Sequence, residues 1–140
     1  MVDRREFLGL GAGAFLSCAS RNGSAPPAPS GAGPAERIFR VAGGAGPLRV
    51  SDGGSGGPAF VFVHGLASDL EVWREQLDFV RAIRRAVAYD QRGHGESARA
   101  ADGAYSIDSL TADLEAVRSA LGLDRIVLVG HSVSGEIVTA

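Results

Sequence analysis

The sequence contains no lysine and a single cysteine, and its charge is nearly balanced. All 14 basic residues are arginines, against 16 acidic residues, which gives a formal net charge of −2. Nucleic-acid binding requires a basic face that neutralises phosphates, so we expect no nucleic-acid partner. Cys18, the lone cysteine, cannot form a disulfide within the chain.

Patterns that would hold a metal ion or a nucleotide are also missing. His64, His94 and His131 are the only histidines, and no Cys/His spacing resembles a zinc site. No G-x-G-x-x-G or Walker sequence falls at a strand–helix junction, which disfavours a Rossmann-type nucleotide-binding protein. We therefore expect no cofactor and no metal.

The first 17 residues hold an apolar stretch, residues 9–16, that is shorter than the roughly 20 residues needed to span a bilayer. It follows Asp3-Arg4-Arg5-Glu6-Phe7-Leu8, which resembles the twin-arginine export signature. An N-terminal helix of the fold is disfavoured, because its three glycines would each cost about 1 kcal/mol relative to alanine. We expect residues 1–17 to be a signal segment and the protein to be periplasmic or extracellular.

Cys18 follows Phe15-Leu16-Ser17, a sequence similar to a bacterial lipobox except that Phe15 replaces the usual leucine. Lipidation of Cys18 would anchor the protein to a membrane. The alternative is a signal cleaved near Ala19, with no role for Cys18. Residues 18–36 are otherwise rich in Gly, Pro, Ser and Ala, and they cannot bury enough apolar surface to offset the entropy of ordering. They are predicted to form a flexible linker.

Residues 37–140 are predicted to form one α/β domain. Five short apolar runs indicate strands at residues 38–41, 48–50, 59–63, 85–89 and 126–129. Three of them, 59–63, 85–89 and 126–129, are typical of strands buried on both faces. Helical spacing predicts helices over residues 69–83, capped by Asp69 or Ser68, and 106–121, capped by Ser106 and followed by Gly122. This alternation predicts a mostly parallel sheet with helices on both faces.

The hexapeptide Gly-His-Ser-Val-Ser-Gly at residues 130–135 follows the last predicted strand and opens a helix. This is the context of a nucleophile elbow, in which a strained turn pushes a serine Oγ into a cleft. Ser132 is the predicted nucleophile, with Gly130, His131 and Ser134 shaping the turn. Ser134 departs from the G-x-S-x-G pattern, which has glycine at that position. The alternative is a tight turn whose serine caps the helix.

Two further motifs follow predicted strands: His64-Gly65, and Asp90 to Ser97 with the sequence D-Q-R-G-H-G-E-S. Together with the elbow, they resemble the α/β-hydrolase superfamily over residues 37–140. The resemblance implies that His64 and Gly65 shape an oxyanion loop, and that the backbone N–H groups of Leu66 and Val133 form the oxyanion hole. It gives no catalytic role to His64 or His94.

The resemblance implies a serine hydrolase that attacks an ester, thioester or amide carbonyl of a small-molecule substrate through an acyl-enzyme. Epoxide hydrolases and haloalkane dehalogenases of the superfamily carry Asp at the elbow, so Ser132 disfavours those activities. Cofactor-free haloperoxidases and carbon–carbon bond hydrolases use serine and remain alternatives. A non-catalytic binding or signalling protein with this fold is another, because fold alone does not establish function.

The position of Ser132 in the chain leaves the triad incomplete. In this fold the order is Ser, then Asp or Glu, then His. Residues 133–140 contain Glu136 and no histidine. We expect the sequence to be the N-terminal part of a longer protein, and the 140-residue chain to be inactive alone.

Overall fold

The structure, a computed structural model, describes residues 35–140. The signal segment, Cys18 and the linker up to residue 34 lie outside the described residues. Along the chain the elements are β1 (Arg37–Gly43), β2 (Gly46–Gly53), β3 (Ala59–Val63), the 3-10 helix η1 (Leu70–Trp73), α1 (Arg74–Arg81), β4 (Ala86–Tyr89), α2 (Ile107–Ala120), β5 (Ile126–Gly130) and α3 (Ser134–Thr139).

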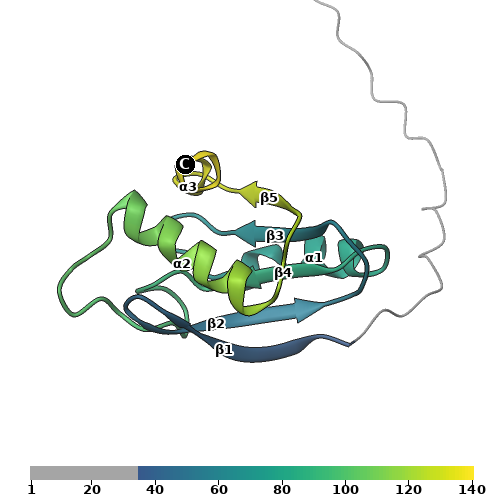
Figure 1. The fold of residues 1–140 in the computed structure, drawn as a ribbon, viewed down its shortest axis with the longest axis horizontal. Helices are drawn as coiled ribbons and strands as arrows, with labels where there is room; N and C mark the ends of the chain where they lie inside the picture. The colour runs from purple at the N-terminus through teal and green to yellow at the C-terminus, as the bar shows by residue number, and fades with distance from the viewer. Residues whose placement is uncertain (1–34) are drawn as a thin grey trace, which may run out of the picture.

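The five strands form one sheet in the order β1-β2-β4-β3-β5 (Figure 1). β3 pairs in parallel with both β4 and β5, whereas β1 pairs with β2, and β2 with β4, in antiparallel fashion. The α/β class is therefore confirmed, but the sheet is mixed rather than mostly parallel. The reason is that an antiparallel hairpin, β1-β2, contributes two of its five strands.

Helices cover both faces of this sheet, with α1 behind it and α2 in front in the view of Figure 1. Successive residues of a strand point to opposite faces, so β3 and β4 contribute to two separate cores. One core joins the sheet to α2 and α3 through Val61, Val63, Val87, Tyr89, Leu114, Val117 and Ile137. The other joins it to η1 and α1 through Phe62, Ala86, Ala88, Leu70 and Leu77.

The segment predicted as one helix over residues 69–83 is instead the 3-10 helix η1 followed by α1, which ends at Arg81. Asp69 caps it as predicted, with its Oδ1 accepting from the Glu71 N–H at 2.9 Å. The Leu70 N–H donates to Asp90 Oδ1 at 2.7 Å. The carboxylates of Asp90 and Asp69 therefore accept from the first two N–H groups of this segment, and the segment begins with the tight turn of a 3-10 helix. The second helix matches its prediction within one residue at each end, and Gly122 has φ +60°.

β5 differs from its predicted burial on both faces. Its residues are half-buried, and the Val127 residue is 37% exposed. The cause is position, because β5 is an edge strand that pairs only with β3. β2 is also longer than the strand predicted at residues 48–50, because it runs from Gly46 to Gly53. Within residues 35–140 no helix is long and apolar enough to cross a bilayer.

Candidate active site

The three motifs identified in the sequence meet at one edge of the sheet. Val63 at the end of β3 is in register with Tyr89 at the end of β4 and with Gly130 at the end of β5. His64, Asp90 and His131 therefore leave three neighbouring parallel strands at the same level. The carboxyl edge of such a sheet is where α/β proteins bind their ligands.

Ser132 occupies a sharp turn between β5 and α3. Its φ is +59°, in the left-handed region that a serine adopts only under constraint, at a cost of order 1–3 kcal/mol. The turn is held by the His131 N–H donating to the Val63 carbonyl at 3.1 Å and the Gly135 N–H donating to the Ser132 carbonyl at 2.9 Å. Ser132 is exposed, as a nucleophile must be. The backbone strain predicted for an elbow is present.

Two glycines let the backbone segments of this turn approach each other. A Cβ on Gly130 would lie 2.7 Å from the Ser134 carbonyl oxygen, so only glycine fits between β5 and α3. A Cβ on Gly65 would lie 3.0 Å from the Ser132 Cβ and 3.1 Å from His131 Nδ1. The loop after β3 therefore packs directly against the Ser132 turn, as the sequence motifs predicted.

The N–H groups predicted to bind an oxyanion are those of Leu66, in the loop after β3, and Val133, after the nucleophile. Neither donates a backbone hydrogen bond within residues 35–140. Leu66 is 74% exposed. Leu66 follows Gly65, which contacts Ser132, and Val133 follows Ser132 directly. Both N–H groups therefore lie in segments that border the serine. Donors at such positions would stabilise a negative charge that develops on the substrate.

His64 orients the Leu66 N–H. Its fully buried ring accepts from the Gln91 N–H at Nε2, at 3.0 Å, which leaves the proton on Nδ1 to donate to the Gly65 carbonyl at 2.7 Å. In a trans peptide the N–H points away from the C=O, so fixing the Gly65 carbonyl fixes the direction of the Leu66 N–H. Burial lowers the pKa of His64 and favours this neutral form. Both ring nitrogens are thus engaged in shaping the loop.

His94 holds the far side of the same loop. Its Nε2 accepts from the Ala67 N–H at 3.2 Å, and its Nδ1 donates to the Arg92 carbonyl at 3.1 Å. Ala67 has φ +55° and is, with Ser132, one of two non-glycine residues in the described part of the chain with a positive φ. Backbone strain is therefore concentrated in the two loops that meet at the candidate site.

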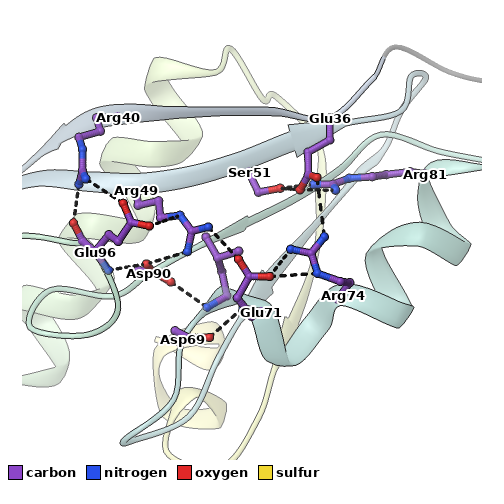
Figure 2. A network of polar contacts seen from close by, with 11 residues as sticks. Glu36, Arg40, Arg49, Ser51, Asp69, Glu71, Arg74, Arg81, Asp90 and Glu96 are labelled. Atoms are coloured by element: carbon purple, nitrogen blue, oxygen red, sulfur yellow. Dashed lines mark hydrogen bonds and ion pairs between the residues drawn. The ribbon is translucent and has the colours of Figure 1, made fainter.

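Asp90 and Arg49 anchor the end of the loop, in the polar network of Figure 2. Buried Asp90 accepts from the Leu70 N–H and, through Oδ2, from the Glu96 N–H at 2.8 Å. Arg49 Nη1 lies 3.6 Å from Asp90 Oδ2, and its Nη2 donates to Glu71 Oε1 at 2.7 Å. Hydrogen bonds from Arg74 and Arg49 lower the pKa of Glu71. The network fixes η1 to β2 and to the loop after β4.

Three buried polar side chains make hydrogen bonds that the sequence did not predict. Gln91 donates through Nε2 to the His64 carbonyl and, at 3.1 Å, to Ser134 Oγ. Asp113 accepts from Arg92 Nε at 2.6 Å and Nη2 at 2.8 Å. The hydroxyl of Ser134, predicted only to be small, donates to the His64 carbonyl. Only Asp113 carried a signal in the sequence, because it adjoins Leu114 on the inward side of α2.

The remaining histidine, His131, is exposed, and its ring lies edge-on to Trp73 with ring centres 6.4 Å apart. In the described part of the chain no group of three or more His, Cys, Asp or Glu side chains could hold a metal ion. At this edge of the sheet the described residues supply an exposed, strained serine beside two N–H groups that donate no backbone hydrogen bond.

Comparison with known proteins identifies the family. Residues 58–140 match the alpha/beta hydrolase fold family. The chain belongs to this family. It is 38% identical over 89 residues to epoxide hydrolase 4 of Mus musculus, covering 63% of this chain. It is 44% identical over 85 residues to the non-heme haloperoxidase of Rhodococcus erythropolis, covering 60% of this chain.

Among solved structures, an epoxide hydrolase from Vigna radiata superposes with a TM-score of 0.68 and 28% identity, over 74% of this chain and 32% of its own. The chain spans 25% of the mouse epoxide hydrolase and 30% of the haloperoxidase. Its relatives are thus hydrolases and a haloperoxidase of one superfamily, and it corresponds to about a quarter to a third of their length.

Proposed function

We propose that the full-length protein is a serine hydrolase that cleaves an ester, thioester or amide through an acyl-enzyme on Ser132. The observation that supports this most is the left-handed backbone of Ser132, exposed beside Gly65 and two unpaired N–H groups. A strained, exposed residue at a strand-to-helix turn is costly for folding, and such strain is typical of a site that positions a reacting atom.

In the proposed reaction the Ser132 oxygen attacks the carbonyl carbon, and the N–H groups of Leu66 and Val133 bind the resulting oxyanion. The serine proton passes to a base and then to the leaving group, and water releases the acyl group by the same route in reverse. His64 and His94 are occupied with loop hydrogen bonds. The exposed ring of His131 lies edge-on to Trp73. We propose that the base and its acidic partner come from outside residues 35–140.

The identity of the elbow residue selects among the activities of the relatives. Epoxide hydrolases of this superfamily attack with Asp, whereas this chain has Ser132. Attack by a serine alkoxide yields an acyl-enzyme from a carbonyl substrate, which favours acyl transfer over epoxide opening. The 44% identity to a haloperoxidase favours cofactor-free haloperoxidase activity as the second candidate.

Hydrolysis of p-nitrophenyl acetate by the full-length protein tests the proposal. We expect a burst of p-nitrophenol equal to the enzyme concentration, followed by slower turnover, and loss of both in Ser132→Ala. Ser119→Ala, at an exposed position of α2, is the matched control and should retain both. Peroxide-dependent bromination by the same preparation would assign the second activity. A wild type with neither activity would refute the proposal.

We further propose that the protein is exported, from its twin-arginine-like N-terminus, with Cys18 as the lipidated residue. Mass spectrometry of the mature N-terminus in the native host tests this. A lipidated Cys18 is the expected result. An unmodified N-terminus near Ala19 would retain export and exclude the anchor, and an intact N-terminus at Met1 or Val2 would refute both.

A further inference from the structure

Ser134 occupies the position at which the elbow pattern has glycine, and its hydroxyl makes hydrogen bonds that glycine could not make. It is fully buried on the first turn of α3. Its hydroxyl donates to the His64 carbonyl and accepts from Gln91 Nε2 at 3.1 Å. Gln91 Nε2 also donates to the His64 carbonyl. The three residues form a closed polar cluster, which we call the strand-end cluster.

The strand-end cluster connects three separate segments. His64 follows β3, Gln91 comes just after β4, and Ser134 follows the turn after β5. The backbone N–H of Gln91 also donates to the ring of His64 at 3.0 Å. The polar atoms of Ser134 and His64 that face this cluster are therefore hydrogen-bonded within it.

The two N–H groups proposed to bind the oxyanion lie on different segments. Leu66 is two residues beyond His64, and Val133 is one residue before Ser134. The hydrogen bond from Ser134 Oγ to the His64 carbonyl is the direct polar link between these segments on the buried side. A glycine at position 134 would remove this link and leave two others, the contact between Gly65 and the serine turn and the hydrogen bond from the His131 N–H to the Val63 carbonyl.

We propose that Ser134 is a positioning residue whose hydroxyl fixes the spacing between the Leu66 and Val133 N–H groups. This rests on the proposed function. Ser134 is too buried to touch substrate, so it acts through His64 and Gln91. Transition-state stabilisation depends on donors being placed where charge develops, so a looser loop slows the chemical step while leaving substrate binding nearly unchanged.

Two measurements on the full-length protein test this role, using Ser134→Ala and Ser134→Gly, with Ser119→Ala as the control. The first is hydrogen exchange of the Ala67 amide, the N–H of this loop that is hydrogen-bonded, to His94 Nε2. Both variants should exchange about tenfold faster there than wild type, with the amides of α2 unchanged. The second is ester hydrolysis, for which kcat should fall about tenfold while KM changes less than about twofold.

The two measurements separate failure of this proposal from failure of the proposed function. Unchanged exchange of the Ala67 amide in both variants would overturn the positioning role, whatever the activity. Faster exchange with unaltered kcat would also overturn it, because the link would then be structural only. A wild type without esterase activity, but with variants whose loop exchanges faster, would refute the proposed function and leave the link between loop and elbow established. Should Ser134→Ala fail to fold, Ser134→Gly carries the test, since the family pattern accommodates glycine there.

Discussion

Gly65 and Ser132 lie so close that a β-carbon on the glycine would stand 3.0 Å from the serine Cβ. The two residues are 67 positions apart in the sequence and belong to loops that leave neighbouring parallel strands, β3 and β5. Their contact places the loop that bears the Leu66 N–H against the residue proposed to be the nucleophile. Four predictions test the residues that build this arrangement.

Replacing Gly65 with alanine should lower the catalytic activity more than it lowers the stability of the fold. The added methyl group would press on Ser132 and His131, so the loop must move away from the serine. We expect kcat for ester hydrolysis to fall on the order of a hundredfold, the size of losing one oxyanion donor. Gly135→Ala is the matched control, because a Cβ there meets nothing within 4 Å. Equal activity of both variants would contradict the close contact.

Replacing Ser132 with glycine should stabilise the protein while abolishing its activity. Glycine adopts φ +59° without the steric penalty that serine bears, so the free energy of unfolding should rise by about 1 kcal/mol. Ala67→Gly, at the other strained position, should give a similar gain. Urea unfolding of the three proteins measures these gains. Destabilisation by Ser132→Gly would argue that the turn is not strained.

Acidification should weaken the fold through His64. Burial lowers the pKa of His64 in the folded protein, against an ordinary value of about 6.5 for an unfolded histidine. As the pH falls through about 6.5, the unfolded chain binds a proton that the folded chain excludes, so stability is lost until the pH drops below the folded pKa. The groups that act on the ring electrostatically are His94, which lowers its pKa, and Asp90 and Asp69, which raise it.

Urea unfolding between pH 8 and pH 5.5 measures this linkage. In His64→Gln the decline over this range should flatten, while His131→Gln, at an exposed histidine, should keep it. The lowered pKa values of Glu36 and Glu71 stabilise the folded protein fully above about pH 4.5, and this stability is lost only below that pH, outside the measured range. An unchanged decline in His64→Gln would assign the linkage to another group.

Two ion pairs involving α2 should contribute very different amounts to the free energy of unfolding. Arg92 and Asp113 are paired with side-chain exposures of 5% and 1%, whereas Arg118 and Glu115 are 34% and 58% exposed. Asp113→Ala leaves a buried guanidinium without its partner, and we expect it to cost about 3–5 kcal/mol. Glu115→Ala should cost less than about 1 kcal/mol. Similar unfolding midpoints for the two variants would contradict the burial of the first pair.

Much of the fold could be predicted because its signals are local. The cap at Ser106, the C-terminal Gly122 and the apolar run of β3 each depend on a few consecutive residues. The partial exposure of β5 depends on its place at the edge of the sheet, which the run of residues 126–129 does not encode. The start of η1 also depends on a distant group, the Asp90 carboxylate that binds the Leu70 N–H.

The same distinction between local signals and distant contacts applies to the candidate site. Ser132 and Gly65 could be predicted because a strand followed by a tight turn is a local pattern. The role of Gln91 could not be predicted, because it depends on hydrogen bonds with His64 and Ser134, which lie 27 and 43 positions away. From the sequence, Ser134 is only a small residue in place of glycine. The hydrogen bond from its hydroxyl to the His64 carbonyl forms only in the folded arrangement.

The most direct test of Ser132 as the nucleophile is peptide mapping after treatment of the full-length protein with a fluorophosphonate. We predict one phosphonyl group per protein molecule, carried by Ser132, and none in Ser132→Ala. A phosphonyl group on another residue, or none on a wild-type protein that is folded, would contradict the account.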